Sequence, residues 1–274
     1  MLTPLREPTE ADLIAATETN YAAYFAGFTI LPQMQLWREA DYTAFVADSA
    51  PGSTVLATRF TAATADAKIH AVLARLTPLV RQTWWQVLPA SQPTDLATRL
   101  LAAGLTELTH ESRPVMTLAL AGHSPAPTVP PTLTIHRVSD ANLMADWTRA
   151  SALGFEASPT NVQPYHDAYS ALGFAEDAPW QHFVGYVDGA PVTSATLLLA
   201  GGLAGVYDVS TAPVARRQGL GGAITRACLA AAQARGLHHA VLQASAEGVG
   251  VYARLGFREL YRERNFGWTR PATL

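Results

Sequence analysis

One glycine-rich turn constrains the fold of this chain more than any other segment. It follows an apolar run at residues 203–209, which we expect to be a strand, and precedes a run at 223–235, which we expect to be a helix. Its sequence is Arg216-Arg217-Gln218-Gly219-Leu220-Gly221-Gly222-Ala223. Glycines allow positive φ angles, and the first amides of a helix lack intrahelical partners at the positive end of the helix dipole. With two arginines beside them, these amides predict a site for a phosphate or pyrophosphate.

Two common phosphate-binding patterns do not fit this turn. The dinucleotide fingerprint G-x-G-x-x-G would need a glycine where the chain has Ile224. A Walker loop needs a lysine after its last glycine, and Lys68 is the only lysine in the chain. The pattern R-x-x-G-x-G does fit, on Arg216, Gly219 and Gly221. Taken alone, this short pattern also describes an ordinary tight turn that starts a helix.

The segment after the turn adds further features in a fixed order. Gly236 follows the expected helix as a C-terminal cap, and residues 239–243 are short and apolar enough for a buried strand. Ser245 comes next, followed by Tyr252 and the pair Gly256-Phe257.

This order resembles the GNAT superfamily of acetyl-coenzyme A-dependent N-acetyltransferases. The signature of that family is P-x-x-R-x-x-G-x-G, a helix, a strand, and an Asn-containing turn that leads to a Tyr and a Gly-Phe pair. The matching residues are Pro213, Arg216, Gly219, Gly221, Tyr252, Gly256 and Phe257. Ser245 stands where the family often has Asn, and a serine can still cap a helix or donate to a ligand.

The resemblance implies how acetyl-coenzyme A would bind. The cofactor would lie in a V-shaped opening between two splayed parallel strands, 203–209 and 239–243. Its pantetheine arm would pair with the edge of the first strand, and its pyrophosphate would lie on the amides of the glycine-rich turn. The expected cofactor-binding residues are Val209, Ser210, Thr211, Arg216, Arg217, Gln218, Gly219, Leu220, Gly221, Gly222, Ala223 and Ser245.

The implied reaction is direct attack of a primary amine on the thioester, without an acyl-enzyme. Tyr252 is the expected acid that protonates the leaving thiolate, because a phenol is mostly protonated at pH 7; a plain core aromatic is the other interpretation. An alkyl amine with a pKa of about 10 needs about 4 kcal/mol to deprotonate at pH 7, so a base is expected. Asp208 on the first splayed strand is one candidate, and a chain of water molecules is another.

The chain divides near its middle. Residues 121–131 are rich in proline and read as a linker. Residues 100–108 echo 252–260, and an expected helix and strand precede each segment, so the two halves are expected to share an architecture. The first half lacks an arginine-glycine turn, and it has Leu100 where the second half has Tyr252.

These features predict an α/β protein with two GNAT-like domains, each a mixed, mostly antiparallel sheet flanked by helices. Residues 1–120 would form a degenerate domain without a cofactor loop, and 132–274 the catalytic domain with the splayed strands. Within the second half, the expected order is strand 133–138, helices 141–153 and 162–172, then strands 182–187 and 191–199 joined at Asp188-Gly189.

Composition excludes several classes of partner. The net charge of −3 gives no basic face for a nucleic acid, and no run is long and apolar enough for a membrane span. The single cysteine, Cys228, fits a reducing compartment, so the cytoplasm is the expected location. The protein is expected to act as a monomer or a homodimer. The histidines lack metal-ligand spacing, so no metal is expected.

Trp84 and Trp85 are expected in the core, and Trp180 is a candidate for a pocket wall.

The sequence does not determine the acceptor substrate, which is either a small molecule or an exposed amine of a peptide. Two alternatives to a simple N-acetyltransferase also stay open. One is a non-catalytic acyl-coenzyme A sensor, and the other is a two-domain synthase that resembles mycothiol synthase and uses only one half for catalysis.

Overall fold

The computed structural model describes residues 3–122 and 131–270, so the expected linker at 121–131 falls almost entirely outside the described residues. In chain order, the elements are α1 (Glu10–Phe28), β1 (Gln35–Arg38), β2 (Thr43–Val46), β3 (Ser53–Leu56), α2 (Ala65–Leu76), β4 (Gln82–Val87), α3 (Leu96–Ala102), β5 (Thr106–Glu107), η1 (Thr109–Glu111), β6 (Pro114–Ala119), β7 (Leu133–Arg137), α4 (Ala141–Phe155), α5 (Pro159–Leu172), β8 (Trp180–Val187), β9 (Ala190–Ala200), β10 (Leu203–Thr211), η2 (Pro213–Ala215), α6 (Leu220–Ala234), β11 (His239–Gln243), α7 (Val249–Arg254), β12 (Arg258–Arg262) and β13 (Arg264–Thr269).

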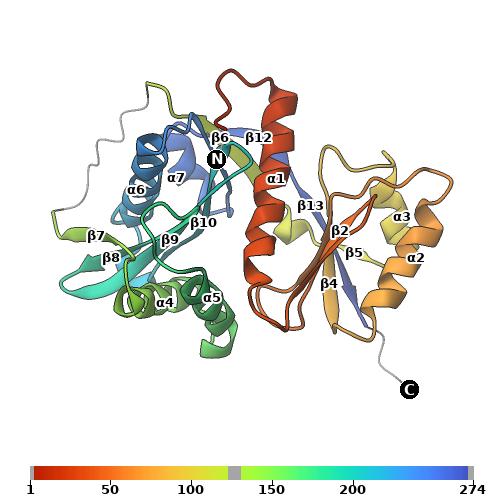
Figure 1. Cartoon of the computed structure of the whole chain (residues 1–274), viewed down its shortest axis with the longest axis horizontal. Coiled ribbons are helices and arrows are strands. Elements are labelled where there is room, and N and C mark those ends of the chain that lie inside the picture. Colours follow the sequence, from red (N-terminus) through yellow and green to blue (C-terminus); the bar gives the residue numbers. More distant parts are fainter. Residues whose placement is uncertain (1–2, 123–130, 271–274) are drawn as a thin grey trace.

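Two mixed sheets stand side by side, with α1 running between them (Figure 1). The first has the strand order β1-β2-β3-β4-β13-β5, and the second has the order β12-β6-β11-β10-β9-β8-β7. Helices α2 and α3 flank the first sheet, while α4 and α5 lie on one face of the second and α6 and α7 on the other (Figure 1). The predicted α/β class, with two mixed sheets flanked by helices, is confirmed.

Each sheet contains one parallel strand pair around a crossover helix. In the first sheet β3 and β4 pair in parallel and α2 connects them; in the second, β10 and β11 pair in parallel and α6 connects them. Each unit then continues into a short helix, α3 or α7. The two halves therefore share an architecture, as the sequence echo predicts.

The two halves exchange a strand with each other. Strand β6 leaves the first half and lies between β11 and β12 of the second sheet. Strand β13, near the other end of the chain, lies between β4 and β5 of the first sheet. The sheets therefore do not follow the expected limits of 1–120 and 132–274, because each one needs a strand from the other half to satisfy its backbone hydrogen bonds.

Helix α1 is the main element that the sequence pattern does not reveal. The side-chain amide of Asn20 donates hydrogen bonds to the carbonyl oxygens of Ala200 at 2.9 Å and Leu198 at 3.3 Å, in the second sheet. On the side of the first sheet, the rings of Phe25 and Phe45 have centroids 5.3 Å apart. The helix is thus buried from two sides and lacks the one-sided apolar stripe of a surface helix.

Local predictions in the second half agree closely with the structure. Strand β11 has the expected limits, and the turn residues Asp188 and Gly189 have φ angles of +50° and +78°, as a tight hairpin requires. Helix α6 begins at Leu220, three residues before the expected start, so Gly221 and Gly222 lie within its first turn.

None of the helices within residues 3–122 and 131–270 is both long and apolar enough to cross a membrane.

The strand exchange predicts that residues 132–274 do not fold alone. This fragment lacks β6, so β11 and β12 would each have an unpaired edge, and β13 would lack β4 and β5. We expect it to show no cooperative thermal transition by circular dichroism, in contrast to the whole chain. A fragment of residues 112–262, which keeps β6 and omits β13, is the matched comparison and should retain more structure. Cooperative unfolding of the 132–274 fragment would contradict this prediction.

Candidate functional site

The site begins where two parallel strands separate. Strands β10 and β11 pair at only two positions, the second being Gly205 with Val241, although β10 continues to Thr211. Beyond that pair, the register of β10 against β9 shifts between Tyr207 and Ser210. The edge of β10 that faces β11 is therefore open over its second half, as expected for splayed strands.

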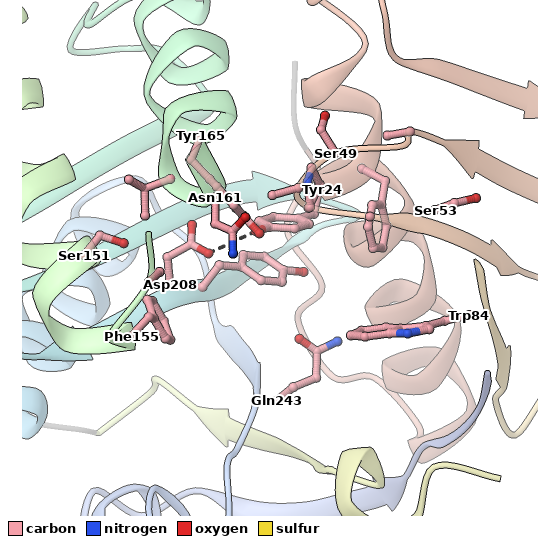
Figure 2. A pocket seen from close by; sticks show the side chains of 18 of the residues that line it. Tyr24, Ser49, Ser53, Trp84, Ser151, Phe155, Asn161, Tyr165, Asp208 and Gln243 are labelled. Carbon is pink, nitrogen blue, oxygen red and sulfur yellow. Dashed lines mark hydrogen bonds between the residues drawn. The ribbon is translucent and has the colours of Figure 1, made fainter. Parts of the chain in front are cut away.

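Asp208 occupies the irregularity in β10. Its φ angle is +51°, in the left-handed region that residues with a side chain seldom adopt and that costs on the order of 1 kcal/mol. A bulge of this kind re-aims a side chain relative to a regular strand. Here the carboxylate of Asp208 points into a cavity between the two halves of the molecule (Figure 2).

The cavity has a volume of about 870 Å³, and both halves line it. The second half contributes the splayed strands through Val209 and Gln243, together with Tyr252 of α7. The first half contributes Tyr24 of α1 and Trp84 of β4 (Figure 2). The residues beside the open edge of β10 therefore face a wall built by the first half.

Hydrogen bonds from two helices hold the carboxylate of Asp208. The hydroxyl of Tyr169 on α5 donates to it at 2.6 Å, and the hydroxyl of Tyr24 donates at 3.0 Å. Burial raises the pKa of Asp208 above its ordinary value, although the hydrogen bonds from Tyr169, Tyr24 and Thr196 act in the opposite direction. Thr196 is itself bonded to the buried ring of His182 at 3.0 Å. The carboxyl group therefore takes up a proton at a higher pH than an ordinary aspartate does.

Tyr252 approaches the same cavity from α7. Its side chain is 8% exposed and packs edge-on against Phe257, with ring centroids 6.0 Å apart. Burial is the main cause that raises the pKa of Tyr252 to about 12, and the neighbouring Cys228 adds to it. The phenol therefore stays protonated at neutral pH and can donate a proton inside the cavity.

The glycine-rich turn forms an exposed anion cradle outside the cavity lining. Arg217 and Gly219 have φ angles of +63° and +81°, and no side chain caps the N-terminus of α6. A Cβ atom at Gly219 would meet nothing within 4 Å, and one at Gly221 would meet only the Thr211 hydroxyl, at 3.6 Å. The uncapped amides of α6 are thus open to a bound diphosphate.

The guanidinium of Arg216 is tied to the protein. It donates to the carbonyl oxygens of Thr211 at 3.2 Å and Gly154 at 3.0 Å, and it forms an ion pair with Glu156 at 3.0 Å. It therefore anchors the turn to the end of α4, while the exposed Arg217 and Gln218 extend from the turn itself.

The remaining expected cofactor contacts fall into two groups. Val209 and Ser245 line the cavity, and the Ser245 hydroxyl accepts a hydrogen bond from the backbone N–H of Gly248 at 3.2 Å. The others have side chains turned toward the protein, so that only their backbone groups could meet a cofactor. Ser210 and Thr211 bond Ser194 and Thr193 of β9, and Leu220 and Ala223 are buried in the core.

Two tryptophans lie differently from the expectation. Trp84, expected in the core, is 37% exposed and lines the cavity, whereas Trp85 is fully buried. Alternation along a strand carries the relevant signal, because two consecutive residues must face opposite sides. Trp180, the candidate for a pocket wall, is buried in β8 and packs beside Tyr24, with ring centroids 5.8 Å apart.

Comparisons with known proteins agree with this geometry. A family model described as an acetyltransferase (GNAT) domain matches residues 178–259. A GCN5-related N-acetyltransferase from Kribbella flavida aligns over 95% of this chain and 96% of its own, with a TM-score of 0.69 and 21% identity. A tandem GNAT protein from the clavulanic acid biosynthesis pathway aligns over 88% and 85%, with a TM-score of 0.61 and 15% identity. No curated protein matches the chain in sequence.

A third structure gives the same result. A GCN5-related N-acetyltransferase from Sphaerobacter thermophilus aligns over 86% of this chain and 79% of its own, with a TM-score of 0.66 and 16% identity. These alignments show that the chain has the fold of GNAT acetyltransferase structures. Residues 178–259 match a GNAT acetyltransferase domain, and the first half also shares the GNAT fold. The resemblance carried by the glycine-rich turn is confirmed.

The residues present fit an acyl-coenzyme A. The open edge of β10, the uncapped start of α6 and the free space at Gly219 are all available to a ligand that carries a diphosphate and an extended arm. In the part of the chain that the structure describes, no cluster of three or more His, Cys, Asp or Glu side chains could hold a metal ion.

We expect Gly221→Asp to abolish coenzyme A binding while the fold survives. The new carboxylate would stand in the first turn of α6, where it suits the helix dipole but repels a diphosphate. Gly221→Asn is the matched control, because it adds nearly the same bulk without the charge and should keep part of the affinity. Isothermal titration calorimetry measures both. Unchanged affinity in a folded Gly221→Asp protein would contradict the assignment of this turn.

Proposed function

We propose that this protein is an N-acetyltransferase that moves the acetyl group of acetyl-coenzyme A to a primary amine by direct attack. One observation carries the proposal: the half-buried carboxylate of Asp208 and the buried phenol of Tyr252 line the same cavity at the open edge of β10. The carboxylate can accept a proton and the phenol can donate one, which are the two proton transfers that amide formation requires.

The thioester supplies an activated acyl carbon, and the chain supplies position and proton transfer. Asp208, with its raised pKa, would take a proton from the bound ammonium and leave a neutral amine. The amine nitrogen would then bond to the acyl carbon as the carbon–sulfur bond breaks, and the nitrogen would release its second proton to solvent. Tyr252 would give its proton to the leaving thiolate and regain one from solvent. The net reaction converts the ammonium and the thioester to an amide, a thiol and one released proton.

The first half would act as a wall of the acceptor site rather than as a second cofactor site. Where this half passes from β3 to α2, Thr61 and Thr64 bond each other through their side chains at 2.8 Å, in place of an arginine-glycine turn. Leu100, which corresponds to Tyr252, is fully buried. We therefore expect one acetyl-coenzyme A for each chain.

Tyr252→Phe tests the acid. We expect kcat to fall by about a hundredfold or more, since a positioned general acid contributes on that order. The ring stays in place beside Phe257, so coenzyme A affinity should be unchanged. Thiol release with a panel of amines measures the rate, and calorimetry measures the binding. A variant that binds coenzyme A and keeps the full rate would show that Tyr252 is not the acid. An unmodified protein that binds coenzyme A but acetylates no amine would favour a sensor.

Tyr169→Phe tests the base through its pKa. The lost hydroxyl donates to the Asp208 carboxylate and lowers its pKa, so its removal should raise that pKa further. A base must be deprotonated to act, so activity rises with pH through this pKa. The acidic limb of kcat/KM should therefore move to higher pH in the variant. Tyr186→Phe is the matched control, because the Tyr186 hydroxyl donates to Asp146 instead. The acidic limb of its kcat/KM profile should stay at the same pH. An unmoved limb in Tyr169→Phe would exclude Asp208 as the base.

A further inference from the structure

The charged side chains that line the cavity are paired, with one exception. The backbone N–H of Arg81 donates to the carboxylate of Asp48 at 2.8 Å, and its Nε donates at 3.2 Å. Arg113 forms an ion pair with Glu111 and lies near the buried Glu263, whose carboxyl feels its charge. A carboxylate beside each of these two arginines therefore offsets part of the positive charge that it presents to the cavity.

Asp208 is the exception. Its carboxylate receives hydrogen bonds from tyrosine hydroxyls, and within residues 3–122 and 131–270 no arginine, lysine or histidine forms an ion pair with it. A half-buried carboxylate without a cationic partner attracts a cationic group of a ligand.

Apart from Asp208 and the paired Asp48, Arg81 and Arg113, the side chains that line the cavity are uncharged. The first half presents the exposed indole of Trp84 together with the side chains of Ser49, Ser53 and Gln82. Figure 2 shows Trp84, Ser49 and Ser53 on the side of the cavity opposite Asp208. This wall offers an aromatic face and neutral hydrogen-bonding groups to whatever extends from a group bound at Asp208.

We infer that the acceptor carries one cationic amine, bound at Asp208, and an uncharged body that extends to Trp84 and the first-half wall. A carboxylate or phosphate on that body would lose its hydration and find only arginines already held by Asp48 and Glu111. The cavity therefore selects against anionic amines, such as amino acids and phosphorylated amino sugars. This inference rests on the proposed function for the role of the amine as acyl acceptor.

Binding measured by calorimetry on the whole chain, with coenzyme A present, tests this inference without requiring turnover. The probes are para-aminoethylbenzoate and its methyl ester, which differ mainly in one distal charge. We expect the ester to bind at least about fivefold more tightly, on the scale of one partly exposed charge interaction. Equal or tighter binding of the carboxylate would overturn the inference, and so would failure of both amines to bind.

The variant Asp48→Asn should invert part of this selectivity. It releases the charge of Arg81, while the remaining amide oxygen can still accept the backbone N–H of Arg81. The ratio of ester to carboxylate affinity should fall by about fivefold. Asp66→Asn, which removes one of the two carboxylates paired with Arg99 away from the cavity, is the matched control and should leave the ratio unchanged. An unchanged ratio in Asp48→Asn would overturn the inference.

The same samples separate this inference from the proposed function. If the ester binds selectively but no thiol is released when acetyl-coenzyme A is added, acetyl transfer is wrong and the charge selectivity stands. If thiol is released equally from both amines, acetyl transfer stands and the charge selectivity is wrong.

Discussion

The backbone hydrogen bonds of two exchanged strands are the constraint on which the rest of this structure depends. Each sheet would have a gap beside its parallel pair, and β6 and β13 fill the two gaps reciprocally. A buried strand edge without partners costs too much free energy to persist, so neither half can complete its sheet alone. The exchange therefore fixes the two halves relative to each other, and it places α1 between them as a shared core element.

The fixed arrangement of the two halves explains how the site can hold Asp208 in an energetically unfavourable conformation and environment. Asp208 combines a left-handed backbone, a half-buried carboxylate and no cationic partner in the described residues, each of which destabilises the folded state. The hydroxyls that hold it come from α1 and α5, which belong to different halves of the chain. Only a rigid junction between the halves could position both donors, so the strand exchange supports the charge state of the candidate base.

Features with short-range causes could be predicted from the sequence, and features with long-range causes could not. The glycine-rich turn, β11 and the Asp188-Gly189 hairpin follow from local conformational preferences. The placement of α1 and β6 depends on surfaces far away in the chain. Trp84 was misassigned because a tryptophan is apolar enough for a core, while its exposure depends on the cavity that the other half closes.

The orientation of the first half agrees with its lack of an anion-binding turn. The cavity meets the starts of β3 and β4, at Ser53 and Gln82, whereas a turn that binds a phosphate would follow the end of β3, near residues 61–64. These lie at opposite ends of the same strands. A phosphate held at residues 61–64 would lie at the end of these strands away from the cavity, so the first half can form a wall of the cavity without an anion-binding turn. The two halves thus share one fold but use opposite ends of it.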